Sequence, residues 1–133
     1  MPSYTISQAA AHSGLSSKQI RDYELKGLLP APSRNSSGYR VYTEHDVHLL
    51  FFIAQARSLG FSLAQIKALL VLWQDKNRSS AQVKQLAQQH IDALESQAQQ
   101  LHQIADILRQ FVQQCRGDER PDCPILKGLE LPL

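Results

Sequence analysis

The strongest constraint on the fold is a repeat of apolar residues in the C-terminal half of the chain. Apolar residues recur every seven positions in two registers over four heptads, which is the pattern of a coiled coil. The two registers consist of Ala87, Leu94, Leu101 and Leu108, and of Ile91, Ala98, Ala105 and Val112. The opposite face is rich in Gln, and the remaining chain is too short to cover the apolar one. We therefore expect a helix over 80–113 that pairs with a second copy in a homodimer; the alternative is a helix packed on its own domain.

The first 30 residues predict two short helices joined by a tight turn. Ser7 is expected to cap the first helix, and Gly14 to end it, because Gly accepts the left-handed conformation. Ser16 or Ser17 is expected to cap the second, which reaches Leu25. Two short helices joined by a Gly-containing turn form a helix-turn-helix.

The residues that follow predict a wing and two further helices. The Pro- and Ser-rich stretch 30–38 reads as a loop, and 39–42 alternates like a strand, which together favour a small hairpin. Thr43 is expected to cap a helix to about Leu59, and Ser62 another to Leu72 or Trp73. The expected fold is mainly α, with a winged helix-turn-helix domain over 1–73, a linker over 74–79, a dimerisation helix over 80–113 and a C-terminal segment over 114–133.

The charge distribution favours a polyanionic partner for the N-terminal part. Residues 1–40 hold five basic and two acidic side chains, a balance of +3, whereas the whole chain carries +2. A helix-turn-helix presents its second helix to the DNA major groove. The candidate DNA-contacting residues on that helix and on the wing are Lys18, Arg21, Tyr23, Arg34, Tyr39 and Arg40. For the Lys and Arg side chains the alternative is an ordinary solvated cation, and for the tyrosines that flank the predicted strand it is a place in the core.

Several of these segments together resemble the MerR family of transcription regulators. They are residues 5–7, 14–16, 20–24, 26–29, 34–42 and 57–63. The resemblance implies a homodimer held by an antiparallel coiled coil, bound to double-stranded promoter DNA whose spacer is too long for RNA polymerase. It also implies that an effector makes the dimer distort that DNA and start transcription. Asp22 stands where the family often has an aromatic residue, so which bases are read is left open.

Cys115 and Cys123 flank seven residues that include Gly, Pro and charged side chains, so the loop between them has no regular structure. Thiolates select soft ions, and two sulfurs without a third donor suit a monovalent ion better than zinc, which prefers four ligands. The Cys pair followed by Pro124 resembles the copper-responsive branch of the family. That resemblance implies Cu(I), or Ag(I) or Au(I), as the bound ion, with Ser80 of the partner chain beside the site. Arg116 departs from this pattern.

The same residues also favour or disfavour other functions. A disulfide between the two cysteines would make the chain a redox sensor, and a missed ligand would make it a Zn(II) or Hg(II) sensor. The C-terminal region is too short to form a drug-binding pocket. Two cysteines are too few for an iron–sulfur cluster, and the sequence shows no catalytic constellation. The sequence has no signal peptide and no membrane-spanning run, so a cytoplasmic protein is expected.

Overall fold

A computed structural model describes residues 2–121 and 123–130. The chain is mainly helical, as expected, and divides into two compact units, Met1–Val83 and Lys84–Leu133. None of the helices in the described part is long and apolar enough to cross a membrane.

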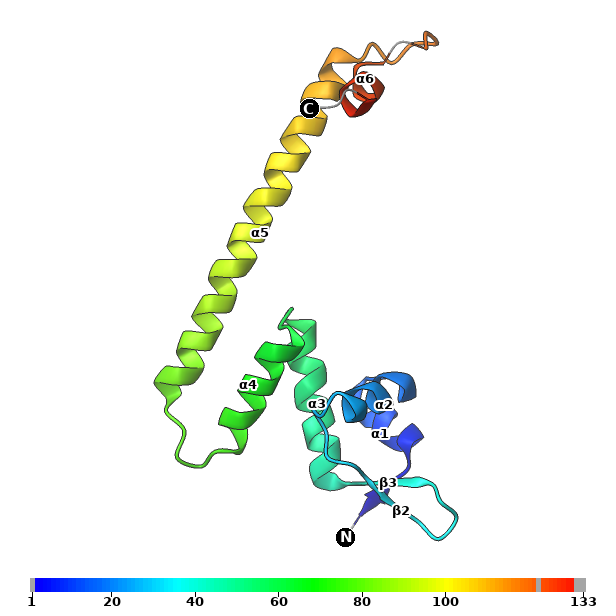
Figure 1. Ribbon diagram of the computed structural model, residues 1–133, viewed down its shortest axis with the longest axis vertical. Coiled ribbons are helices and arrows are strands. Elements are labelled where there is room, and N and C mark those ends of the chain that lie inside the picture. The colour runs from blue at the N-terminus through cyan, green and yellow to red at the C-terminus, as the bar shows by residue number, and fades with distance from the viewer. Residues whose placement is uncertain (1, 122, 131–133) are drawn as a thin grey trace. The chain divides into compact units, whose positions relative to one another are not determined.

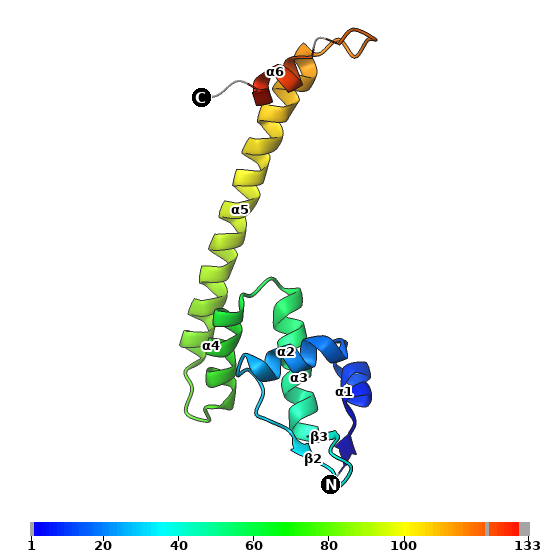
Figure 2. The same ribbon diagram turned by 45° about the vertical axis from the view of Figure 1, so that its right-hand side comes forward.

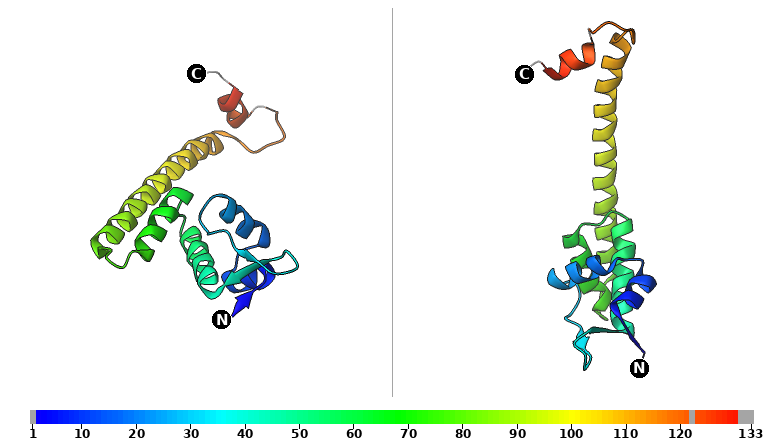
Figure 3. Two further views of the ribbon diagram at one scale, coloured as in Figure 1. Left: turned by 60° about the horizontal axis from the view of Figure 1, so that its bottom comes forward. Right: turned by 90° about the vertical axis from the view of Figure 1, so that its right-hand side faces the viewer.

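The first unit combines four helices with a three-stranded sheet (Figure 1). In chain order its elements are β1 (Ser3–Tyr4), α1 (Ile6–Ser13), α2 (Ser17–Leu25), β2 (Ser33–Arg34), β3 (Arg40–Thr43), α3 (Glu44–Ser58) and α4 (Leu63–Gln74). The strands lie in the order β1-β3-β2, and both pairs are antiparallel. The β2–β3 hairpin is the predicted wing, and its tip projects beyond the helices of this unit (Figure 3).

Reciprocal capping boxes define where the helices of this unit begin. Thr43 and Ser62 cap α3 and α4 as predicted, and Ser16 caps α2. The prediction for α1 was wrong: the helix begins at Ile6, and Thr5 rather than Ser7 is its cap. Thr5 accepts a hydrogen bond from the backbone N–H of Gln8, whose side chain accepts one from the N–H of Thr5, so both ends of the box are satisfied.

The core of the unit fixes the position of α2. This helix buries Ile20 and Tyr23, while α1 packs against α2 and α3. Val47, Leu49, Leu50 and Ile53 of α3 complete the buried cluster together with Tyr42 of β3. Burial on this face leaves the other face of α2, which carries Lys18 and Arg21, exposed to solvent.

The second unit contains most of α5 (Ser80–Gln114) and all of α6 (Pro124–Glu130). The bounds of α5 agree with the predicted helix to within one residue. The predicted coiled-coil positions except the half-buried Ala105 are exposed in the single chain, with Leu94 42%, Leu101 66% and Val112 60% accessible. The sequence did not predict α6, which lies beside the last turns of α5 (Figure 2).

Candidate DNA interface and candidate metal site

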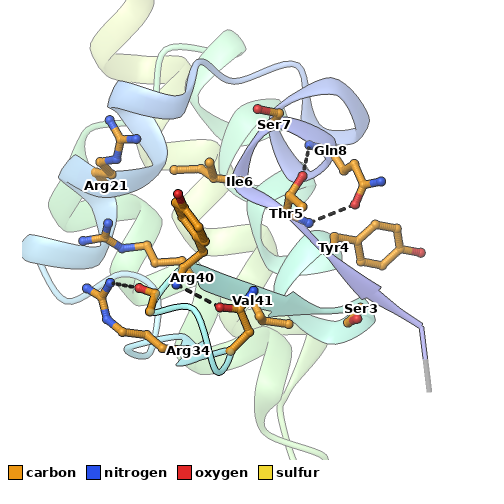
Figure 4. A pocket seen from close by; sticks show the side chains of 13 residues that line it. Ser3, Tyr4, Thr5, Ile6, Ser7, Gln8, Arg21, Arg34, Arg40 and Val41 are labelled. Carbon is orange, nitrogen blue, oxygen red and sulfur yellow. Dashed lines mark hydrogen bonds between the residues drawn. The ribbon is translucent and has the colours of Figure 1, made fainter.

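Three arginines from separate elements line one pocket of the first unit. Arg21 comes from α2, Arg34 from β2 and Arg40 from β3, and the pocket has a volume of about 610 Å³. Their guanidinium groups lie along one side of it (Figure 4). We call this the arginine pocket. A concentration of guanidinium groups on a helix face and an adjacent wing is the footprint of a phosphate-binding surface.

The three arginines differ in how firmly they are held. The Arg40 Nε donates to a carboxylate oxygen of Glu24 at 3.0 Å, and both side chains are half-buried. Arg34 donates to the backbone carbonyl of Gly38 at 2.8 Å, within the turn of the wing. Arg21 is exposed and has no hydrogen-bond or ion-pair partner among residues 2–121 and 123–130. Arg21 is therefore the most available of the three for an external anion.

The tip of the wing is shaped by Asn35, a residue that the sequence analysis did not single out. Its side-chain oxygen accepts hydrogen bonds from the backbone N–H groups of Ser37 and Tyr39, both at 3.0 Å. Gly38 has φ +83°, a left-handed conformation that suits Gly in a turn. The turn leaves the side chain of Tyr39 72% exposed at the edge of the arginine pocket.

Tyr23 and Lys18, the other two predicted DNA contacts, lie outside the arginine pocket. Tyr23 is 3% exposed, and its hydroxyl accepts a hydrogen bond from the Arg57 guanidinium, which also lies 5.9 Å from the ring centroid. Tyr23 is thus a core residue in the described fold, and its hydroxyl, which was predicted to contact phosphate, is engaged by Arg57. Sequence reasoning missed Arg57, because the two residues are 34 positions apart. Lys18 is exposed near the start of α2.

The two cysteines face each other across the end of α5 and the start of α6. Cys115 directly follows α5, and Cys123 directly precedes α6, whose Lys127 N–H donates to the Cys123 carbonyl at 3.1 Å. The two Sγ atoms are 3.8 Å apart, and both thiols are free. Pro124 occupies the first helical position, where its missing N–H costs nothing. The chain thus places two thiols close enough to bind one ion.

Packing between the two helices holds this arrangement. A methyl group at Gly128 of α6 would overlap the ring of Phe111 on α5, so the helices approach closely only because residue 128 is Gly. Between the cysteines, Gly117 has φ +68° and the Asp118 carboxylate accepts a hydrogen bond from the Arg120 N–H at 2.9 Å. The loop therefore reverses the chain and returns Cys123 to the end of α5.

The environment of Cys123 favours its thiolate. Hydrogen bonding from the backbone N–H of Leu126 is the largest cause that lowers the pKa of the Cys123 thiol, and the N–H of Ile125 and the Cys115 thiol act in the same direction. Desolvation opposes them but is outweighed. Because thiolates rather than thiols bind metals, this environment favours metal binding.

The donor set around the two thiols is small. Residues 2–121 and 123–130 contain no group of three or more His, Cys, Asp or Glu side chains arranged to hold a metal ion. Ser80 is the first residue of α5 and Cys115 follows its last, so the full 35-residue helix separates them in one chain. In the described part of a single chain, the candidate site consists of two sulfur donors.

Comparison with protein families identifies both parts of the chain. A model described as MerR HTH family regulatory protein matches residues 4–71, and one described as MerR, DNA binding matches residues 47–111. The chain is 51% identical to an uncharacterised HTH-type transcriptional regulator of Pseudomonas aeruginosa, over 93% of this chain and 94% of the other. It is 46% identical to heavy metal-dependent transcription regulator 2 of Rhizobium meliloti (93% and 84%) and 42% identical to the transcriptional regulator CueR of Vibrio cholerae (94% and 90%).

Solved structures share the fold over almost the whole length. The complex of a transcription regulator from Ralstonia metallidurans with lead(II) matches with a TM-score of 0.81 and 26% identity, over 93% of this chain and 97% of the other. A MerR family regulator lacking the sensor domain, bound to promoter DNA, matches with a TM-score of 0.56 and 25% identity, over 98% of each chain.

The lowered pKa of Cys123 predicts how its reactivity depends on pH. In a Cys115→Ser variant, alkylation of Cys123 by iodoacetamide should reach half its maximal rate at a lower pH in the native protein than in urea. The reason is that the N–H groups of α6 stabilise the thiolate only in the folded state. Pulsed labelling followed by peptide mass spectrometry measures both profiles. Coincident profiles would show that the start of α6 does not influence the thiol.

Proposed function

Since the chain belongs to the MerR family of helix-turn-helix regulators, which are not enzymes, we propose that it is a metal-responsive activator of transcription. In this proposal it binds promoter DNA as a homodimer and responds to Cu(I), or to Ag(I) or Au(I), through Cys115 and Cys123. It then switches on genes for metal efflux or detoxification. The observation that carries the proposal is the separation of 3.8 Å between two free sulfurs with no third protein ligand among the described residues.

The donor set favours a monovalent soft ion. Two thiolates provide two negative charges and two soft donors, which satisfy a monovalent d10 ion of low coordination number. Cys115 and Cys123, whose sulfurs lie 3.8 Å apart, would hold such an ion as its two soft donors. Zinc would require about two more ligands, usually Cys or His. Ser80 of the partner chain is proposed to lie close to the site rather than to complete it.

The exposed apolar positions of α5 support the proposed homodimer. Residues at the predicted a and d positions, among them Ile91, Leu94, Leu101 and Leu108, are between 42% and 66% accessible in one chain. Burying them against a second α5 in an antiparallel coiled coil would remove this apolar surface from water. We accordingly assign DNA binding to residues 1–73, connection to 74–79, dimerisation to 80–113 and metal sensing to 114–133.

In the proposed mechanism the protein's own residues convert metal binding into a change at the DNA. Arg21, Arg34 and Arg40, together with Lys18 and Tyr39, hold the promoter through the second helix and the wing. Both cysteines give up their protons when a metal binds, so binding is coupled to pH. Ordering of the loop and of α6 then biases the dimer toward the arrangement in which RNA polymerase can use the promoter.

The proximity of the two thiols also favours a second candidate function, redox sensing. Sulfur atoms 3.8 Å apart need only a local movement to form a disulfide, whose S–S bond is about 2.05 Å long. A regulator of this kind would respond to oxidant without metal. A divalent-metal sensor, for Zn(II) or Hg(II), remains a third candidate if the partner chain supplies a further ligand.

The assignment of Arg21 predicts a specific loss of DNA binding. Arg21→Ala should weaken retardation of promoter DNA by about fivefold or more, because one arginine contact contributes roughly 1–3 kcal/mol. Lys67→Ala is the matched control, since it removes one exposed positive charge from α4 of the same unit. A folded Arg21→Ala protein that retards the promoter like the control would contradict the assignment.

The assignment of the cysteines to metal binding predicts that a cysteine variant loses the response to metal but keeps DNA binding. Cys115→Ser should bind promoter DNA with unchanged affinity but give no rise in transcription when Cu(I) is added to a reconstituted transcription reaction. Cu(I)-dependent transcription by this variant would refute the two-thiolate site. A rise caused by oxidant in the metal-free wild type, lost in the same variant, would instead support the redox candidate.

A further inference from the structure

A second pocket opens directly beside the candidate metal site. It has a volume of about 480 Å³, within the range of small-molecule sites. Cys123 forms part of its wall, next to Pro124, and Phe111 and Gly128 close it where α6 meets α5. The proposed function uses the sulfur of Cys123 but gives no role to this space.

The wall of the pocket is cationic. Arg116, Arg120 and Lys127 contribute three positive charges, whereas Asp118 contributes one negative charge. Arg120 is engaged by Asp118, with its Nε 3.4 Å from the carboxylate. Arg116 and Lys127 have no ion-pair partner within residues 2–121 and 123–130. Two cations are therefore available to an anion that enters beside the Cys123 sulfur.

A soft metal ion that reaches such a site must come from a carrier, because thiols in the surroundings bind soft ions tightly. A small thiol that carries carboxylates forms a metal complex with net negative charge. Such a complex would place its metal against the Cys123 sulfur while its carboxylates meet Arg116 and Lys127. Cationic clefts raise the local concentration and the arrival rate of anionic ligands by roughly 10–10³-fold.

We propose that this pocket receives anionic complexes of low-molecular-weight thiols and passes their metal to the two cysteines by ligand exchange. This inference rests on the proposed function, because it assumes that Cys115 and Cys123 bind the metal. In the exchange, the two bonds from the ion to donor sulfur break as bonds to the Sγ atoms of Cys123 and Cys115 form. The two donor thiolates leave as thiols with the protons that the cysteines release, and no electrons are transferred.

The experiment compares the rates of Cu(I) transfer from two donors to reduced protein in the absence of oxygen. One donor is the Cu(I) complex of glutathione, an anionic thiol, and the other is the Cu(I) complex of N-acetylcysteamine, an uncharged one. Transfer from glutathione should be about tenfold faster at low salt and should lose this advantage at high salt, because screening shortens the reach of the charges.

Variants separate the pocket from the general charge of the protein. The double variant Arg116→Gln/Lys127→Gln should remove most of the preference for the glutathione complex, whereas Lys84→Gln, which changes an exposed residue near the start of α5, should not. The final occupancy with Cu(I) at equilibrium, measured with a competing chelator, should be the same in all three proteins. Far-UV circular dichroism confirms that the variants are folded.

The measurements distinguish failure of the pocket proposal from failure of the proposed function. Equal rates for both donors, or a preference that survives in the double variant, would overturn the pocket while leaving the proposed function intact. A fall in equilibrium affinity without a change in donor preference would also overturn it, because the cations would then act on the bound state. If wild-type protein takes Cu(I) from neither donor at equilibrium, the proposed function itself fails.

Discussion

The structure depends above all on an apolar surface that one chain exposes along α5. Leu101, Ile104, Ile107 and Val112 are more than half accessible, in a helix whose other positions are predominantly polar. Packing of this apolar face against a second helix would stabilise α5, because an isolated helix in water is stabilised by local helix propensity alone. Pairing through α5 would join two DNA-binding units in one molecule. In the proposed antiparallel pairing, opposite ends of the two helices would lie near each other, and Ser80 of one chain would then approach the cysteines of its partner.

Each unit positions its functional residues by local packing. In the first, burial of Ile20 and Tyr23 fixes α2, and the Glu24–Arg40 ion pair ties that helix to the wing. Core packing and one ion pair between α2 and β3 thus hold the arginines of the pocket near one another. In the second unit, Gly128 allows α6 to approach Phe111, and this contact returns Cys123 to the end of α5. A few guanidinium groups can hold a phosphate, and two thiolates can hold a soft ion. Neither site therefore needs a large pre-formed cavity.

Local signals in the sequence were sufficient for most of the helices. Thr43, Ser16 and Ser62 each begin an S/T-x-x-D/Q pattern, and the helices begin there because the cap satisfies N–H groups within the same turn. The same pattern at Thr5 and Gln8 marks α1 and could have corrected the choice of Ser7. The elements that were missed are those without a local signal. β1 has only two residues and forms through its pairing with β3, and α6 is short and contains a Gly that weakens its helical pattern.

The most direct test of the central claim is an anaerobic titration of the reduced protein with Cu(I) and with Zn(II), each against a competing chelator. The account predicts tight binding of one Cu(I) per chain, loss of that binding in Cys115→Ser, and weak binding of Zn(II). Tight Zn(II) binding would contradict it and would require a further ligand, from a histidine or from the partner chain. Tight binding of neither ion would also contradict it, and would leave the disulfide between Cys115 and Cys123 as the basis of sensing.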